Sequence, residues 1–211
     1  FSDAILKNIE FSSGSDFSFK LNKKLKLKDL KINSKIKLNE LKIFIFLKLK
    51  KFLPNIKDDI ILTDNDLEIE YSNENLFVNG YGDILLQNNK DNLSYSFEKK
   101  NDELKFKTNL EIKKNPLIID ILNYKRNSNN ETKITLNGTK AKDQTITINS
   151  FSLDEANNKI YLKNLIIDEN FQLIDLESID LNYVDTKNEK NLIQIFKKDK
   201  DYFLKGKLFN A

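Results

Sequence analysis

The 211-residue sequence contains no cysteine, histidine, methionine or tryptophan. Without cysteine and histidine, the chain cannot form disulfides, thiol nucleophiles, the common zinc sites or any histidine-dependent acid–base device. Glycine and proline are also scarce, at five and two residues, which is fewer than a compact sandwich with frequent tight turns needs. We therefore expect Asn, Asp and Lys at the turns. We also expect that the chain is not an enzyme and that it binds no cofactor.

Long apolar runs and a strong charge of one sign are missing as well. No stretch approaches the ~20 apolar residues of a membrane-spanning helix, and no N-terminal signal pattern is present. Lys and Arg total 35 against 32 Asp and Glu, a balance that argues against a nucleic-acid partner. The length of 211 residues suits one unit, residues 1–211. Because the chain starts at Phe1 without Met and ends at Ala211 without a charged tail, we expect this unit to be cut from a longer protein.

Strict alternation of apolar and polar residues dominates what is present. Phe17, Phe19 and Leu21 alternate with polar residues, and similar segments recur to the end of the chain. Period-two alternation predicts strands with one apolar face. We expect about a dozen or more strands in an all-β fold, a long antiparallel meander.

The apolar positions change parity twice near the start of the chain, after Leu27 and again after Leu38. Two-residue turns at Lys28-Asp29 and Asn39-Glu40 would explain both changes, because residues flanking such a turn share one face of a hairpin. Bulges within a longer strand are the alternative. Both interpretations give a sheet with one apolar face.

One or two short helices are expected. Asn115 and Pro116 fit a helix start, and the apolar residues that follow fall on one helical face, which predicts a helix near 116–125. Residues 51–56, around Pro54, are expected to form a second short helical turn. Since a run of strands follows each segment, the sequence indicates a weak internal repeat, approximately 52–112 and 116–211.

Three patterns have a chemical interpretation and a simpler structural one. Asp64, Asp66, Glu68 and Glu70 alternate and could form a calcium or acid-pair site, but a solvated strand face is favoured because Ile69 stands where a calcium loop needs glycine. Gly80-Tyr81-Gly82 lacks the helix of a phosphate loop, so turn or bulge glycines are expected. The lysines of the early strands could meet anionic lipid headgroups, but a solvent-facing edge is favoured. These lysines are Lys24, Lys26, Lys35, Lys37, Lys42, Lys48 and Lys50.

The order of several short segments resembles the AsmA-like proteins, YhdP branch. The resemblance is based on the segments Phe52-Leu53-Pro54, Tyr71-Ser72-Asn73, 78–82, 122–124, 134–138, 158–165, 179–183 and the ending 204–211. Asn210 replaces the acidic residue that is usual in that ending. The resemblance implies a periplasmic bridge protein of a Gram-negative bacterium, anchored in the inner membrane by a segment outside this chain. It further implies that the long twisted sheet curls into an open, taco-like groove, which conducts phospholipid toward the outer membrane.

Two functional interpretations remain open. In the first, apolar side chains line a groove for phospholipid acyl chains. The residues expected to line it are Leu41, Ile43, Ile45, Leu67, Ile69, Tyr71, Leu104, Phe106, Leu110 and Ile112. In the second, the same residues form the core of a self-contained sandwich or solenoid that acts as a structural, adhesion or carbohydrate-binding module. The difference is whether other parts of the protein cover the apolar face.

Overall fold

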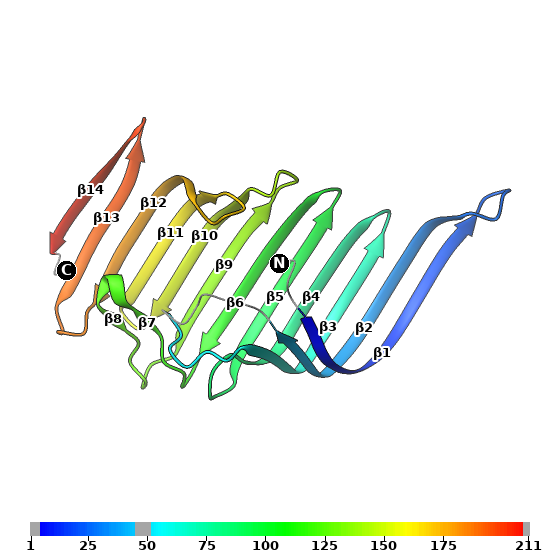
Figure 1. Ribbon diagram of the computed structural model, residues 1–211, viewed down its shortest axis with the longest axis horizontal. Helices are drawn as coiled ribbons and strands as arrows, with labels where there is room; N and C mark the ends of the chain where they lie inside the picture. The colour runs from blue at the N-terminus through cyan, green and yellow to red at the C-terminus, as the bar shows by residue number, and fades with distance from the viewer. Residues whose placement is uncertain (1–4, 45–51, 209–211) are drawn as a thin grey trace.

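The chain forms one open sheet of twelve antiparallel strands in a computed structural model that describes residues 5–44 and 52–208. The strands lie side by side in chain order, from β1 at one edge to β14 at the other (Figure 1). Within the described residues, β1 and β14 do not pair, so the sheet is not closed. Its strands are β1 Ile5–Leu21, β2 Leu27–Phe44, β3 Asp59–Ser72, β4 Asn75–Leu85, β5 Asp91–Lys100, β6 Glu103–Ile112, β9 Thr132–Lys140, β10 Ile146–Glu155, β11 Asn158–Ile167, β12 Leu173–Val184, β13 Lys190–Lys198 and β14 Asp201–Leu208.

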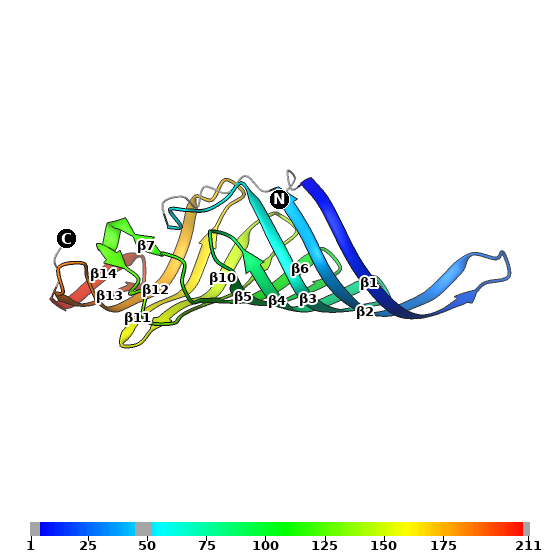
Figure 2. The same cartoon turned by 90° about the horizontal axis from the view of Figure 1, so that it is seen from below.

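This architecture confirms the expected fold class. The only other sheet in the described part of the chain is a two-stranded one, made of β7 (Ile118–Ile119) and β8 (Tyr124–Lys125). The large sheet is bent, and β7 lies on one side of it (Figure 2). Alternation explains the two different faces: residues directly opposite each other on paired strands point the same way, so a period-two apolar pattern builds one apolar face.

The two ends of the strands differ. At one end, which we call the open end, short turns join β1 to β2, β3 to β4, β5 to β6, β9 to β10, β11 to β12 and β13 to β14. At the opposite end the connections include residues 52–57, 86–90 and 113–131, which we call the cover. Backbone hydrogen bonds join these segments, for example Ile118 N to Phe52 O at 2.9 Å and Lys57 N to Leu86 O at 2.9 Å. The cover is therefore one connected layer.

The first hairpin corrects the expected turns. Lys28-Asp29 and Asn39-Glu40 both lie inside β2, so the two-residue turns are wrong and the bulge alternative is right. Asp29 has φ 52°, and the register with β1 shifts between Glu10 and Phe11, opposite Asn39 and Glu40. The actual turn is at residues 22–26, where the Asn22 side chain accepts hydrogen bonds from two backbone N–H groups.

The expected helix near 116–125 is also wrong. The segment contains one 3-10 turn, η2 (Asp120–Leu122), between β7 and β8, and Asn123 ends it with φ 48°. The physical reason is tertiary pairing: Ile118 N donates to Phe52 O and Arg126 N donates to Leu117 O, so local helix propensity is overridden. Of residues 51–56, the described part, from Phe52, forms a tight turn in which Ile56 N donates to Leu53 O at 3.0 Å.

The core lies between the cover and the adjacent half of the apolar face. Leu53, Ile56, Leu117 and Tyr124 from the cover are buried against strand residues such as Ile112, which is 1% exposed. The rings of Tyr124 and Tyr183 meet edge to face with centroids 6.1 Å apart. Burial of these side chains holds the cover on the sheet, since apolar burial contributes about 25 cal/mol per Å².

Candidate functional site

Toward the open end, the apolar face continues beyond the cover as rows of side chains that run across the strands. One row is continuous from β3 to β12, because each member is directly opposite the next. We call it the phenylalanine row; its members are Ile69, Val78, Phe97, Phe106, Gly138, Ile148, Leu165 and Leu176. At ~4.8 Å per strand spacing, the row is about 34 Å long.

A second row lies one step closer to the open end, and we call it the rim row. Its paired members are Ile32, Tyr71, Leu76, Lys99, Leu104, Lys140, Ile146, Ile167 and Leu173. Most of its apolar members are only half-buried, and Leu173 is 59% exposed. The rim row is therefore the boundary between the apolar face and water.

The structure divides the residues that the sequence predicts for the groove. Leu41, Leu67, Leu110 and Ile112 belong to the core or pack against it. The others that the structure describes are half-buried and outside that core: Ile43, Ile69, Tyr71, Leu104 and Phe106. Ile69 and Phe106 share the phenylalanine row, and Tyr71 and Leu104 share the rim row. Ile45 lies outside the described residues.

Arg126 fixes the cover to the strand ends. This residue is the only arginine of the chain and is 5% exposed. Its guanidinium donates to the Thr132 hydroxyl at 2.9 Å and to the carbonyls of Ile112 at 3.1 Å and Asn115 at 3.2 Å. Since its N–H groups are pointed at fixed acceptors of β6, β9 and the connecting segment, the buried cation ties three parts of the chain together.

Two buried carboxylates complete the polar layer beneath the cover. Asp91 accepts from Asn115 Nδ2 at 2.6 Å, and burial raises the pKa of the Asp91 carboxyl. Glu155 accepts from the Tyr124 hydroxyl at 2.5 Å and from Asn127 N at 2.6 Å. Burial, and then the hydrogen bond to Glu155, raise the pKa of Tyr124 far above its usual range, so the phenol stays protonated. These groups lie under the cover, away from the open rows.

The four alternating carboxylates of β3 lie on a solvated strand face, as expected from the sequence. Asp64, Asp66, Glu68 and Glu70 are all exposed, and two of them pair with lysine: Asp64 with Lys90 at 3.3 Å and Glu68 with Lys35 at 3.8 Å. Lys42 likewise pairs with Asp59 at 3.2 Å. The described lysines among those expected at the edge are exposed or half-buried, and Lys48 and Lys50 lie outside the described residues.

Gly82 lies opposite the bulge in β3, as expected of a bulge glycine, whereas Gly80 is a regularly paired strand residue, which corrects the expectation for Gly80. Both lie inside β4 and are buried. A Cβ on Gly80 would be 2.4 Å from Cζ of Tyr95, and a Cβ on Gly82 would be 2.5 Å from Cγ of Asn65. The glycines are needed because side chains of the neighbouring strands cross them. Asn65 follows Asp64, whose φ of 53° marks the bulge in β3.

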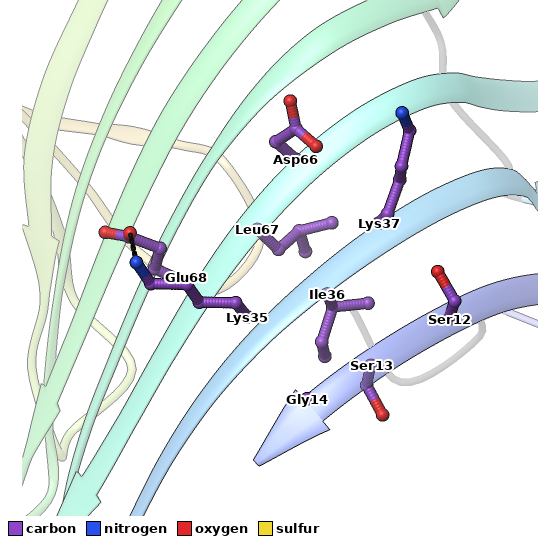
Figure 3. A pocket seen from close by; sticks show the side chains of 9 residues that line it. All are labelled: Ser12, Ser13, Gly14, Lys35, Ile36, Lys37, Asp66, Leu67 and Glu68. Carbon is purple, nitrogen blue, oxygen red and sulfur yellow. Dashed lines mark ion pairs between the residues drawn. The ribbon is translucent and has the colours of Figure 1, made fainter. Parts of the chain in front are cut away.

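A hollow of about 390 Å³ lies on β1, β2 and β3 (Figure 3). Ile36 and Leu67 lie side by side in it, whereas β1 contributes Ser12, Ser13 and Gly14. Ser13 is directly opposite Ile36. The apolar row through Ile36 therefore ends at β2, and polar residues bound this part of the face.

The groove residues predicted from the sequence do not include the members of the phenylalanine row on β10, β11 and β12, which are Ile148, Leu165 and Leu176. The sequence signal that could have identified them is a spacing of three between residues on the apolar face, as from Ile148 to Phe151 and from Leu162 to Leu165. Such a step marks a bulge, and Asn164 has φ 46° at the second of these places. Spacing of three inside an otherwise alternating strand is thus the pattern that identifies these inward residues.

Comparison with known proteins identifies no relative: no family model, curated protein or solved structure matches the chain. Within residues 5–44 and 52–208, no helix has the length and apolarity that a membrane crossing requires.

Proposed function

We propose that the chain is a segment of a periplasmic bridge-like protein whose open apolar rows hold phospholipid acyl chains and conduct them between the inner and outer membranes. The observation that supports this proposal best is the phenylalanine row, which continues across eight paired strands outside the covered core. An apolar surface of this kind needs an apolar partner to exclude water from it.

The dimensions fit an acyl chain. The row is about 34 Å long, whereas one leaflet of a bilayer has about 15 Å of hydrocarbon depth, half of the ~30 Å core. Each methylene that leaves water contributes about 0.8 kcal/mol. Because seven of the eight strands present an apolar side chain and Gly138 is the one exception, most neighbouring positions hold a chain with similar energy, and movement along the row needs no chemical step.

The covered end of the sheet determines how a bound lipid would be oriented. At that end the cover buries the apolar face in the protein core, and the charged side chains of Arg126, Asp91 and Glu155 are buried there as well, so no apolar surface is left for a lipid tail. The open end has no such layer among the described residues. In this proposal an acyl chain lies on the phenylalanine row and the lipid head points toward the open end, where the turns meet water.

Photo-crosslinking tests the proposal. A photoreactive amino acid at position 106, in the phenylalanine row, is expected to capture phospholipid when the protein is made in bacteria. The matched control is position 107, the adjacent residue, which is exposed and opposite Ser96 on the other face. Capture at neither position, or equally at both, would count against the groove.

A pair of charge substitutions separates the groove from a closed core. Ile69→Asp lies in the open row and is expected to fold but to lose bound lipid. Ile112→Asp buries a carboxylate where the side chain is 1% exposed, and this substitution is expected to prevent folding, because a domain has only about 5–15 kcal/mol of stability. If both variants unfold, the self-contained module is supported instead.

A further inference from the structure

We infer that Lys99 and Lys140 form a cationic clamp for the phosphate of a phospholipid whose acyl chains lie on the phenylalanine row. The inference rests on the proposed function and adds the lipid class: a diacyl lipid with a net anionic, phosphate-bearing head. It comes from the positions of two lysines in the rim row, whose other paired members have apolar or aromatic side chains.

Both lysines point to the apolar side of the sheet. Lys99 is directly opposite Leu76 on β4 and Leu104 on β6. Lys140 is directly opposite Leu104 on β6 and Ile146 on β10. Opposite residues of antiparallel strands share a face, so the two cations flank Leu104 in the rim row.

The spacing suits one anion. β5 and β9 are separated by β6, so the Cα atoms of the two lysines are about 10 Å apart. A lysine stem extends roughly 6 Å and lies along apolar surface while its ammonium stays in water. Both ammonium groups can therefore reach one phosphate above Leu104.

The lysines also lie at the correct level for a lipid head. Phe97 precedes Lys99 by two residues on β5, and Gly138 precedes Lys140 by two residues on β9. Two residues of strand span about 7 Å. A phosphate held at the rim row therefore has the apolar phenylalanine row directly below it, which matches the order of head and tails in a phospholipid.

Neither lysine has an acidic partner within the described ranges. The ion pairs there use other lysines, including the nearby Lys142, which contacts Asp102 at 2.9 Å. Lys100 and Glu103 are opposite each other on the other face. The two positive charges of the rim row are therefore available to an anion from outside the chain.

Lipid extraction from vesicles tests the clamp. The 211-residue chain is mixed with phosphatidylcholine vesicles that contain either labelled phosphatidylglycerol or labelled diacylglycerol with the same acyl chains. The wild type is expected to extract phosphatidylglycerol preferentially. Lys99→Gln with Lys140→Gln is expected to lower that extraction roughly tenfold or more, since each lysine near an anionic lipid contributes about 1 kcal/mol, and to leave diacylglycerol extraction unchanged.

The matched control is Lys105→Gln with Lys107→Gln, which removes the same charge from exposed residues on the opposite face of β6. This control is expected to extract both lipids as the wild type does. An equal loss of phosphatidylglycerol in both double variants, or no loss in the rim variant, would overturn the clamp. Equal extraction of both lipids by the wild type would overturn the clamp alone, whereas extraction of neither would overturn the groove itself.

Discussion

The ring of Tyr95 lies across Gly80 of the neighbouring strand, so that a Cβ on Gly80 would be 2.4 Å from Cζ of the ring. Gly80→Ala is therefore expected to destabilise the protein by about 1–3 kcal/mol, because the buried ring must turn outward. Denaturant unfolding measures the change. In a Tyr95→Ala background the cost of the alanine is expected to vanish.

Gly14→Ala is the control for this substitution, because nothing lies within 4 Å of the added Cβ. We expect it to be neutral or slightly stabilising, since alanine loses less backbone entropy than glycine on folding. Equal losses of stability at positions 14 and 80 would show that the close approach of Tyr95 does not matter.

The hydrogen bond from the Tyr124 hydroxyl to Glu155 gives a second prediction. Tyr124→Phe leaves a carboxylate that is 1% exposed with one donor fewer, at an expected cost of about 1–3 kcal/mol in the free energy of unfolding. Tyr161→Phe, on a residue that is 39% exposed, is expected to change stability by less than about 0.5 kcal/mol. Similar effects of the two substitutions would contradict a structural role for the buried pair.

Arg126 gives a third prediction, for the attachment of the cover. Arg126→Lys keeps the positive charge but removes the planar group that reaches Thr132 and the carbonyls of Ile112 and Asn115. The expected loss is about 2–4 kcal/mol, with faster proteolysis within 113–131 than elsewhere. Lys125→Arg, at an exposed neighbouring position, is the control. Unchanged proteolysis of the Arg126→Lys variant would show that packing alone holds the cover.

Asp91 gives a prediction about pH. Burial raises the pKa of this carboxyl above its usual 3.8, so the folded state binds its proton more readily than the unfolded state does. Stability from this group is therefore complete below about pH 3.8 and is lost as the pH rises through the higher folded value. We expect wild-type stability, measured relative to Asp91→Asn, to be greater near pH 4 than near pH 7. A difference that does not change with pH, or that changes in the opposite direction, would contradict the raised pKa.

Alternation was sufficient to predict the strands and their common apolar face, because period two is a local property of the sequence. It did not separate a turn from a bulge at Asp29 or Asn39, since both reverse the parity of the apolar positions. The bulge is recognised only when β2 is seen to continue on both sides and to pair with β1 and β3.

Alternation could not predict which part of the apolar face is buried under the cover and which part stays open. Whether Ile112 is buried and Phe106 half-buried depends on where the cover lies, and the cover is held by contacts between distant residues, such as Ile118 with Phe52. The apolar pattern after Pro116 fits a helix or a covering segment equally well. Only tertiary hydrogen bonds decide between them.

The serial order of the strands has a consequence for how the fold opens. Extensive contacts between the large strands occur only between hydrogen-bonded neighbours, so cooperativity passes from each strand to the next, as in a repeat array. Residues 8–21 of β1 and 201–207 of β14 are exposed, whereas Arg126 of the cover holds the adjacent ends of β6 and β9 together. Amide hydrogen exchange should therefore be fastest in the two edge strands and slowest where β6 and β9 pair. Strands can detach from either side while the middle stays intact, so the chain frays inward instead of unfolding in a single step.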